Sequence, residues 1–512
     1  MEFPTSPMIL LDGESLTLDA LAAIADGAEV GLAPDAARRV DAARAVVDRH
    51  AEGDEPVYGI NTGFGALAET RIPHEALGTL QINLLRSHAA GIGDPLPVRA
   101  VRASMALRAN VLAKGFSGLR RSTLDLLLAL LNRRVHPRVP GRGSVGASGD
   151  LAPLAHLALV LVGEGAATVG DDPRLLPGRE ALARAGLSPV TLAAKEGIAL
   201  INGTQPSAAV AALAAVDAGQ LAAAADIAAA LSIDALRGSV HPFEARIHRA
   251  RPHPGQADSA ANILRLLSGS GINKSHEHCG RVQDAYSLRC AAQVHGAARD
   301  ALRFVRTIVT IEANSATDNP MVFAEDDAIV SGGNFHGAPV AIAADLLAIA
   351  VAQFCTISER RADRLVNPAL SGLPAFLTPN SGLQSGFMMA QVTSAALTSE
   401  VKTLAHPAGV DSIPTSANRE DHVSMSMGAA LKAARAVDLA AHVLAVEILC
   451  AAQAIDLLAP LETSRALGRV HARIRSEVPA LAGDRPPSPD IEAIARMIVD
   501  GSLKSACGVE VK

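Results

Sequence analysis

Aromatic side chains are almost missing from this chain. Tryptophan is absent, tyrosine occurs twice, and Phe, Trp and Tyr together make up 2% of the 512 residues. A protein that packs its core almost without tyrosine has little structural use for that residue, so the two copies, Tyr58 and Tyr286, are candidates for functional hydroxyl groups. Both lie in polar stretches next to glycine or close to glutamine.

Cysteine is scarce as well. The five cysteines are odd in number and scattered, namely Cys279, Cys290, Cys355, Cys450 and Cys507. Their distribution excludes a disulfide framework and is typical of free thiols in a reducing cytoplasm. The first residues contain no basic segment followed by an apolar one, so we expect no secretory signal and a cytoplasmic location.

Long uncharged runs and surplus basic charge are missing too. No stretch of about 18 apolar residues occurs without a charge, and the longest Ala-rich run, 207–231, is interrupted by Asp217 and Asp226. We expect a buried core helix in that run and no membrane partner. The net charge is −6, and no basic stripe appears, so nucleic acid is not an expected partner either.

Alanine and leucine in long helical patterns are what the chain has in abundance. Apolar residues make up 49% of the chain and charged residues 19%, which is typical of a packed globular protein. Five segments are longer than an ordinary helix: 207–236, 285–314, 338–364, 386–405 and 423–457. The pattern predicts a mainly α fold. We expect a smaller α-rich N-terminal domain over 1–205, and a long-helix bundle with C-terminal helices over 206–512.

A glycine-rich loop at 140–150 leads into an apolar segment. Glycine is used where the backbone turns tightly or takes positive φ. Gly141, Gly143 and Gly146 match the spacing of a dinucleotide-binding loop. That motif needs a preceding strand, and the prolines before this loop cannot donate to a strand ladder. The spacing alone therefore gives little support to a dinucleotide site.

The same loop presents Ala147-Ser148-Gly149. A serine hydrolase could use Ser148 as its nucleophile, but the surrounding sequence is one glycine short of the required elbow. A third chemistry is cyclisation, in which the amide nitrogen of Gly149 attacks the carbonyl of Ala147 and Ser148 then loses its hydroxyl. The product is a methylidene-imidazolone, an electrophile that no ordinary side chain provides.

A possible metal cluster occurs at His276-Glu277-His278-Cys279. Its spacing does not place two histidines on one helix face, and the neighbouring glycines and serines indicate a loop. We expect a surface turn there, and no metal site.

Seven motifs in order make the chain similar to a known family. They are 57–65 (Val-Tyr-Gly-Ile-Asn-Thr-Gly-Phe-Gly), 87–93 (Ser-His-Ala-Ala-Gly-Ile-Gly), 147–151 (Ala-Ser-Gly-Asp-Leu), 202–205 (Asn-Gly-Thr-Gln), 283–290 (Gln-Asp-Ala-Tyr-Ser-Leu-Arg-Cys), 332–336 (Gly-Gly-Asn-Phe-His) and 416–425 (Ser-Ala-Asn-Arg-Glu-Asp-His-Val-Ser-Met). The chain resembles the aromatic amino acid ammonia-lyases, and most closely the members that act on histidine.

The resemblance implies a cofactor and a catalytic set. Ala147, Ser148 and Gly149 are expected to form a 4-methylidene-imidazol-5-one autocatalytically, with no metal. Tyr58 is implied as the general base that removes the β-proton of the substrate. Tyr286 is implied as a second catalytic tyrosine that orients the substrate and the imidazolone oxygen. The resemblance also implies a homotetramer whose active sites are shared between subunits.

The resemblance further implies residues that bind the substrate. Arg289 has the planar fork that suits a carboxylate, and Glu420 suits the N–H groups of an imidazole. The implied substrate is thus L-histidine, and the products are trans-urocanate and ammonia. Arg419 stands where these members usually carry glutamine and could pair with Glu420. The full set is His88, Asn202, Gln283, Arg289, Phe335 and Glu420.

Three other functions stay open at this point. The first is a tyrosine or phenylalanine ammonia-lyase, or an aminomutase, of the same family. The second is a serine hydrolase that uses Ser148. The third is a non-catalytic helical scaffold that retains the motifs.

Overall fold

The computed structural model describes residues 8–53, 55–63, 70–277, 280 and 282–512. The structure is 60% helix and 8% strand, which confirms the prediction of a mainly α fold. Four motif residues, Phe64, Gly65, His278 and Cys279, lie outside the described residues.

The chain divides into two compact units. The first comprises residues 1–213, 306–345 and 407–431, and the second comprises 214–305, 346–406 and 432–512. The chain therefore returns twice to the first unit after residue 213. The expected boundary at 205/206 lies eight residues before that first crossing, and the division into domains 1–205 and 206–512 stays a prediction.

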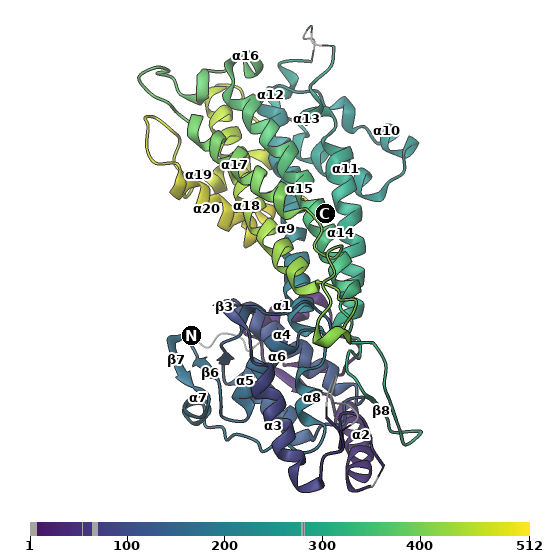
Figure 1. Ribbon diagram of the computed structural model, residues 1–512. Helices are drawn as coiled ribbons and strands as arrows, with labels where there is room; N and C mark the ends of the chain where they lie inside the picture. The colour runs from purple at the N-terminus through teal and green to yellow at the C-terminus, as the bar shows by residue number, and fades with distance from the viewer. Residues whose placement is uncertain (1–7, 54, 64–69, 278–279, 281) are drawn as a thin grey trace. The chain divides into compact units, whose positions relative to one another are not determined.

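Helices of short and medium length build the core of the first unit (Figure 1). The helix α4 packs against α1 and α5, whereas α3, α6 and α8 pack against one another. All residues of α4 from Ala100 to Ala113 are buried, and so is the whole of α8. The helices are α1 (Leu18–Ala25), α2 (Pro34–Glu52), α3 (Leu77–His88), α4 (Val98–Ala113), α5 (Arg121–Asn132), α6 (Leu151–Leu161), α7 (Gly178–Arg184) and α8 (Glu196–Ile201).

Short strands add small sheets to this unit. In the pair that leads to the glycine-rich loop, β3 (Ile92–Pro95) runs antiparallel to β5 (Pro140–Arg142). The strand β4 (Val135–Pro137) precedes the loop and β5 begins it, so the argument that prolines exclude a strand there was wrong. Pro140 is the first residue of its strand, a position that proline tolerates. The other strands are β1 (Ile9–Leu11), β2 (Val30–Leu32), β4 (Val135–Pro137), β6 (Ala166–Val169), β7 (Asp172–Pro177), β8 (Met321–Phe323) and β9 (Ala328–Val330).

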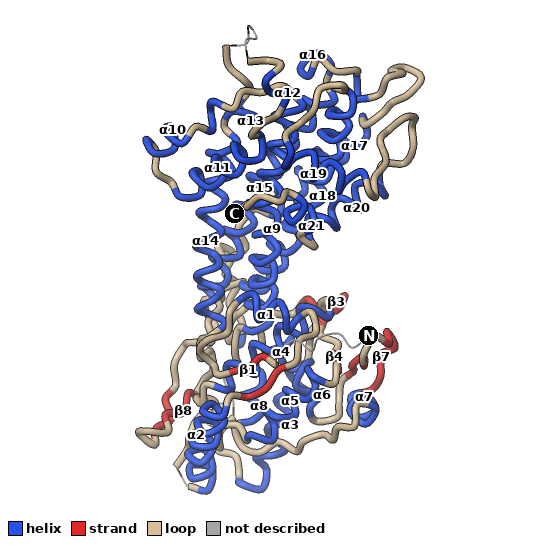
Figure 2. Tube along the Cα trace, turned by 180° about the vertical axis from the view of Figure 1, so that it is seen from behind, coloured by secondary structure: helices blue, strands red, loops and turns tan. Residues whose placement is uncertain are grey.

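Four long helices run alongside one another through the second unit (Figures 1 and 2). They are α9 (Gln205–Ala235), α14 (Ala291–Ala313), α15 (Ala338–Val366) and α18 (Ser426–Leu457). The predicted helix over 285–314 is divided at Cys290, which takes φ −103° and ψ 12° and interrupts the helical series. Shorter helices complete the unit: α10 (Ala245–Ala250), α11 (Pro254–Leu267), α12 (Gly271–Lys274), α13 (Tyr286–Arg289), α16 (Pro368–Ser371), α17 (Met388–Leu404), α19 (Arg465–Arg475), α20 (Ser488–Val499) and α21 (Ser502–Ala506).

Buried charges join the long helices of the second unit. Asp226 on α9 accepts a hydrogen bond of 2.6 Å from Arg299 on α14. Glu447 on α18 accepts one of 2.6 Å from Ser232 on α9 and forms a two-pronged pair with Arg361 on α15, at 2.5 and 2.9 Å. A buried charge is costly unless it is paired and hydrogen-bonded. These pairs therefore specify which faces of the helices meet.

Three of the long helices are apolar enough to span a membrane by length and composition, namely α9, α15 and α18. The sequence argument asked for a run without charge and therefore excluded a span, since α9, for example, contains Asp217 and Asp226. Within the protein the most apolar stretches of these helices are 78%, 72% and 89% buried, respectively. The prediction of a buried core helix over 207–231 is confirmed by α9.

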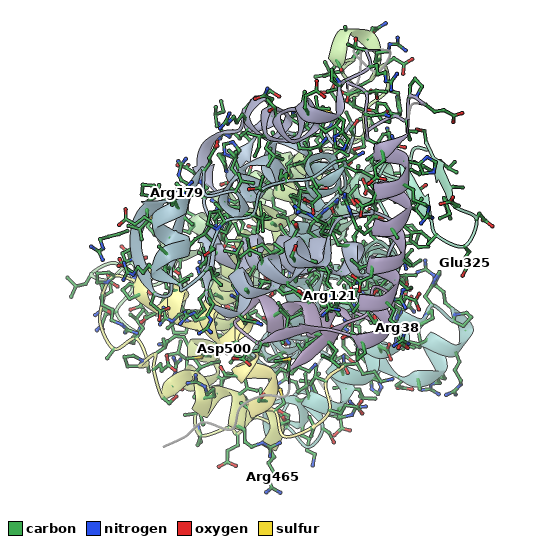
Figure 3. All side chains as sticks on the ribbon, turned by 90° about the horizontal axis from the view of Figure 1, so that it is seen from below. Arg38, Arg121, Arg179, Glu325, Arg465 and Asp500 are labelled. Carbon is green, nitrogen blue, oxygen red and sulfur yellow. The ribbon has the colours of Figure 1, made fainter. Side chains whose placement is uncertain are left out.

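Other charged side chains face the solvent. Glu325 in the first unit and Arg465 in the second are exposed and point away from the ribbon (Figure 3). Such residues serve as neutral reference positions for substitution, because exposed charges contribute little to stability.

Asp226→Asn is expected to lower the free energy of unfolding by about 3 kcal/mol at neutral pH, because Arg299 is left buried without its counter-charge. Burial by itself would raise the pKa of Asp226, but the Arg299 charge and the His295 hydrogen bond outweigh it and lower the pKa to about 2. The stabilisation is therefore complete above the ordinary carboxyl pKa of 3.8 and disappears as the pH falls through about 2.

Chemical unfolding of both proteins between pH 7 and pH 2 tests this expectation, and the difference between them should shrink toward the acid end. The matched control is Asp438→Asn on α18, whose side chain is 57% exposed and pairs with Arg435. This change should cost less than about 1 kcal/mol. Equal stability of the wild type and Asp226→Asn at pH 7 would contradict the role of the buried cluster.

Candidate active site

The glycine-rich loop is anchored at its end by one buried carboxylate. Asp150 Oδ1 accepts a hydrogen bond of 2.6 Å from Ser144 Oγ, and Asp150 Oδ2 accepts one of 2.8 Å from Ser207 N. Asp150 is fully buried, and burial raises the pKa of its carboxyl. The carboxylate thus ties the start of the loop to the start of α9, immediately before α6 begins.

The segment before α18 supports the other side of the loop. Met425 N donates to Val145 O at 2.7 Å, and Ser424 Oγ donates to Gly146 O at 2.8 Å. Two segments almost 280 residues apart in the chain are thereby held together. Residues 147–149 lie between this contact and the Asp150 anchor.

Gly149 lies directly against Gly203. Gly149 has a φ of +67°, and a Cβ atom on it would lie 2.2 Å from Gly203 O. The two glycines form a parallel β-bridge, and Asp150 N donates to Gly203 O at 2.8 Å. Only glycine fits at position 149, because any side chain would collide with backbone. Sequence reasoning noted the amides around Gly203 but missed this backbone contact, for which the Asn-Gly dipeptide was the available signal.

The turn 202–205 that carries Gly203 is tied down by its own side chains. Asn202 Nδ2 donates to Asn319 O at 3.0 Å, Thr204 Oγ1 donates to Glu312, and Gln205 Nε2 donates to Thr317 Oγ1 at 2.7 Å. Asn202 Oδ1 is buried without a hydrogen-bond partner among the described residues. A buried acceptor without a partner is costly, so this atom marks a position suited to a donor or a bound group.

Glu420 reaches the centre of the loop. Ser148 Oγ donates to Glu420 Oε1 at 3.0 Å, and Thr415 Oγ1 donates to Glu420 Oε2 at 2.6 Å. Arg419 is exposed, whereas both carboxylate oxygens of Glu420 are engaged by hydroxyls. The structure therefore orients this carboxylate toward Ser148.

The backbone next to Glu420 is strained. Ser416, Ala417 and Asn418 have φ values of 51°, 52° and 66°, a left-handed region that costs non-glycine residues of order 1–3 kcal/mol each. Backbone bonds between Thr415 and Glu420 close this short turn, with Thr415 N donating to Glu420 O at 3.0 Å. The surrounding fold thus holds the carboxylate at the end of a turn that would not form by itself.

His88 ends α3 on the same side of the unit. Its Nδ1–H donates to Leu84 O at 2.9 Å. Burial lowers the pKa of His88, whereas the Leu84 hydrogen bond and the charge of Glu420 act in the opposite direction. The imidazole is therefore neutral at neutral pH and lies within the electrostatic reach of Glu420.

Phe335 and Tyr58 are both half-buried in loops of the first unit. The residue after Phe335, His336, bonds to His422 O at 3.1 Å, and the rings of His336 and His422 stack with centroids 5.8 Å apart. Phe335 thus belongs to the segment that meets the Glu420 region. Beside Tyr58, a Cβ on Gly59 would lie 2.9 Å from Pro320 Cδ, and Pro320 follows the Asn319 that holds Asn202.

The remaining candidate residues belong to the second unit. Tyr286 and Arg289 share one face of α13, with the Arg289 guanidinium carbon 4.5 Å from the Tyr286 ring centroid. Arg289 Nε donates to Asp284 O at 2.9 Å. Tyr286 is 71% exposed, and Gln283 is exposed as well. These side chains therefore present a hydroxyl, an amide and a guanidinium at a surface.

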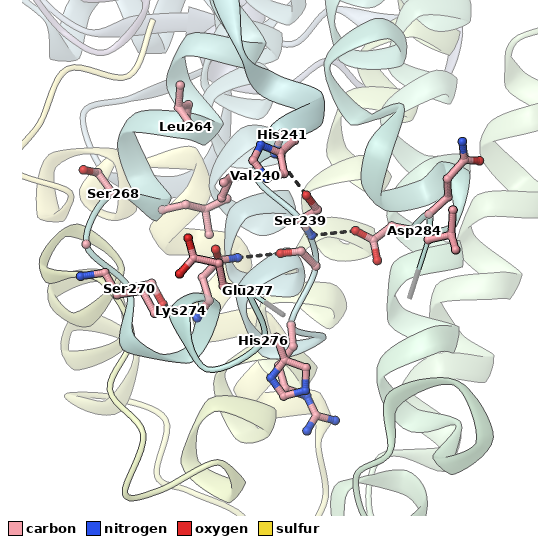
Figure 4. Close-up of a pocket in the computed structure, with 17 residues that line it drawn as sticks. Ser239, Val240, His241, Leu264, Ser268, Ser270, Lys274, His276, Glu277 and Asp284 are labelled. Atoms are coloured by element: carbon pink, nitrogen blue, oxygen red, sulfur yellow. Dashed lines mark hydrogen bonds between the residues drawn. The ribbon is translucent and has the colours of Figure 1, made fainter. Parts of the chain in front are cut away.

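Gln283 and Asp284 also line a pocket of about 460 Å³ in the second unit (Figure 4). Its wall includes His276 and Glu277, and Ser239 N donates to Asp284 Oδ2 at 2.7 Å. Within the described ranges of the chain, no group of three or more His, Cys, Asp or Glu residues could hold a metal ion. The expected absence of a metal stays a prediction, since His278 and Cys279 are not among the described residues.

The candidate residues thus fall into two groups. The first unit contains Tyr58, His88, Ala147, Ser148, Gly149, Asn202, Phe335 and Glu420, and the second contains Gln283, Tyr286 and Arg289. The first group combines a closely held Ala-Ser-Gly loop, a carboxylate and a neutral imidazole. Such a set suits the binding of a small polar ring next to residue 148. The second group suits the recognition of a carboxylate.

Comparison with known proteins supports the family resemblance that the sequence motifs indicate. The family model for aromatic amino acid lyases matches residues 16–476. The histidine ammonia-lyase of Anaeromyxobacter dehalogenans is 58% identical over 504 residues, which cover 97% of this chain and 99% of that protein. The crystal structure of histidine ammonia-lyase from Trypanosoma cruzi matches with a TM-score of 0.92 and 45% identity, over 98% of this chain and 95% of that one.

A solved relative with another activity is equally similar in fold. The tyrosine aminomutase from Streptomyces globisporus matches with a TM-score of 0.93 and 38% identity, over 99% of this chain and all of that one. The fold therefore does not distinguish between members of the family, whereas the family itself is clear: this chain belongs to the aromatic amino acid lyases.

Proposed function

We propose that the protein is a histidine ammonia-lyase, which removes ammonia from L-histidine to give trans-urocanate in the first step of histidine degradation. The observation that carries this proposal is the position of the Glu420 carboxylate, whose Oε1 lies 3.0 Å from the side-chain oxygen of Ser148. A carboxylate at this position can accept a hydrogen bond from an imidazole N–H, whereas a phenyl ring would exclude water from Oε1 without offering a donor, which is costly. The 58% identity to a relative named histidine ammonia-lyase supports the same substrate.

The proposal includes a 4-methylidene-imidazol-5-one formed from Ala147, Ser148 and Gly149, with no metal. The surroundings fit such a group, because Gly149 lies against Gly203 without room for a side chain. Asn202 Oδ1, a buried acceptor without a partner among the described residues, suits the ammonium group of the substrate instead, since the cyclised group has no N–H to donate. This group supplies the electrophile that makes the departure of ammonia feasible. The protein itself supplies orientation and proton transfer.

Each remaining residue has a role in binding or proton transfer. Tyr58 removes the β-proton as general base, and Arg289 holds the substrate carboxylate in a two-pronged contact. Tyr286, Asn202 and Gln283 orient the amino acid. His88 and Phe335 hold the imidazole ring together with Glu420.

The active enzyme is proposed to be a cytoplasmic homotetramer whose sites combine residues of different subunits, with no nucleic acid or membrane partner. The exposure of Tyr286, at 71%, supports this arrangement, because a catalytic side chain so open to solvent in one chain needs a covering partner. The four described cysteines are free thiols, as a reducing compartment requires.

A tyrosine-specific lyase or aminomutase is the second candidate, because the tyrosine aminomutase has a TM-score of 0.93 to this chain. A serine hydrolase is disfavoured, because the sequence around Ser148 is one glycine short of the nucleophile elbow and the relative that is 58% identical is named histidine ammonia-lyase. Assays with L-histidine, L-tyrosine and L-phenylalanine distinguish these candidates.

Intact mass spectrometry is expected to find the wild-type chain lighter than its sequence by two water molecules. Ser148→Ala removes the hydroxyl that must leave, so this variant should lack the second loss and be inactive. Ser122→Ala, at an exposed position on α5, is the control and should keep the full deficit. A wild-type chain of unreduced mass with full activity would refute the cofactor.

Glu420→Gln is expected to lower kcat/KM for L-histidine roughly 10- to 100-fold, because a hydrogen bond to a charged group contributes about 1.5–3 kcal/mol. Urocanate absorbance measures the rate, and circular dichroism checks that the fold is kept. The control Glu325→Gln changes an exposed glutamate and should leave the rate unchanged. Unchanged turnover in Glu420→Gln would remove Glu420 from the binding site.

Mixed oligomers test the sharing of sites. Tyr58→Phe and Arg289→Ala should each lose most activity alone. When the two variants are co-expressed and assemble at random, about a quarter of the sites would contain both native groups if these come from different subunits. Activity well above the sum of the single variants is the expected result, and no gain would place both residues in one chain's site.

A further inference from the structure

A fully buried arginine lies under the turn that supports the cofactor loop. Arg108 on α4 has none of its side chain exposed to solvent. Burial lowers the pKa of Arg108 to about 10, and only the charge of Asp318 opposes this effect. Within the described chain, no carboxylate forms a salt bridge with this guanidinium. Burial of a charge without a counter-ion is costly, so the polar groups around Arg108 must compensate for it.

Three oxygen atoms accept hydrogen bonds from this guanidinium. Arg108 donates to Asn202 O and to Gln205 Oε1, both at 2.7 Å, and to Ala199 O. Two of these acceptors are carbonyls at the end of α8, where helix carbonyls lack partners of their own. All three belong to residues 199–205, which end in the turn that holds Gly203. A planar guanidinium presents five N–H donors in a fixed fork, whereas an ammonium is a compact charge with three.

The guanidinium is also in close contact with the glycine that meets the loop. Gly203 has a φ of +151°, and a Cβ atom on it would lie 2.6 Å from an Arg108 guanidinium nitrogen. On its other side Gly203 contacts Gly149, where a Cβ would lie 2.2 Å from Gly203 O. The order of contacts is therefore Arg108, Gly203, Gly149. Gly203 and Gly149 meet through their backbones. A movement of the guanidinium would therefore be passed on to Gly149, because no flexible side chain lies between the two glycines to absorb it.

Ring formation depends on where the backbones of Gly203 and Gly149 lie. In the proposed reaction the Gly149 nitrogen forms a bond to the Ala147 carbonyl carbon, and that carbonyl oxygen leaves as water with the amide protons of Gly149 and Ser148. Ser148 then loses its Cα proton and its hydroxyl as the second water. No oxidant is required. The approach of one amide nitrogen to a carbonyl only two residues away demands a tightly held turn, and misplacement by about 1 Å costs roughly 100-fold in such reactions.

We propose that Arg108 is a positioning residue for cofactor formation, because its guanidinium holds the Asn202–Gly203 turn against which the Ala147-Ser148-Gly149 loop bends. This inference rests on the proposed function, since it concerns the formation of the proposed cofactor. Arg108 touches neither the substrate nor the reacting atoms. Its effect passes through Gly203.

The test follows the two-water mass deficit of the full-length chain in samples taken at intervals during cell-free synthesis. Arg108→Met keeps an unbranched apolar stem but removes all three hydrogen bonds, and the deficit should appear roughly 10- to 100-fold more slowly than in the wild type. Arg108→Lys retains the charge without the planar fork, and its mass deficit should appear at a rate between those of the wild type and Arg108→Met. Gln205→Met removes one of the three acceptors and should cause a smaller delay.

The matched control is Arg102→Met, six residues earlier on α4. Arg102 is also buried, and it donates to Ile24 O and Leu131 O, at 3.0 and 2.9 Å, away from the turn. This variant should lose thermal stability comparably yet reach the full deficit at the wild-type rate. Slow ring formation in Arg102→Met as well would show a general effect of destabilisation and overturn the proposal.

The outcomes separate this inference from the proposed function. A folded Arg108→Met chain that loses both waters as fast as the wild type overturns the role of Arg108 and leaves the proposed function intact. A wild-type chain without any deficit refutes the cofactor, and the inference with it. If Arg108→Met does not fold, Arg108→Lys and Gln205→Met test the proposal instead. A mass deficit that appears at the wild-type rate in both variants would overturn it.

Discussion

The backbone contact between Gly149 and Gly203 sets the geometry of the first unit around the candidate active site. A side chain on either residue would collide with backbone or with the Arg108 guanidinium. The loop 140–150 can therefore pass close to the turn 202–205 and still be held by Asp150 and Ser424 on its two sides. The close approach that chemistry at residues 147–149 needs is thus a consequence of two positions without a Cβ atom.

Several segments must be placed correctly for this contact to form. The turn at Gly203 is held by the Arg108 guanidinium on α4, by the Glu312 carboxylate and by the backbone carbonyl of Asn319. The support for Glu420 comes from residues 415–426, part of which is in a strained left-handed conformation. Local strain of this kind persists where the surrounding structure determines the backbone. The first unit is therefore built from three separated stretches of chain that meet at one loop.

The packing of the long helices in the second unit is specified in a different way. Their alanine-rich surfaces allow close packing on every side, and apolar pattern alone does not specify which faces meet. Buried pairs such as Asp226–Arg299 and Arg361–Glu447 supply that information. The same unit carries Tyr286 and Arg289 at its surface, where the two side chains stack. The proposed sharing of sites between subunits would cover this exposed pair.

The sequence by itself determined the class of fold, the long helices and the family, because helical periodicity and ordered motifs are local properties of the chain. It also indicated Ser148 and Glu420 as candidates. It did not reveal that Cys290 divides a helix, that Pro140 begins a strand, or that Asp150, Gly203 and Arg108 hold the loop. The contacts that hold the loop join residues 57 to 278 positions apart. Only the tertiary structure decided them, because a hydrogen bond across the fold leaves no periodic signal in either of the segments that it joins.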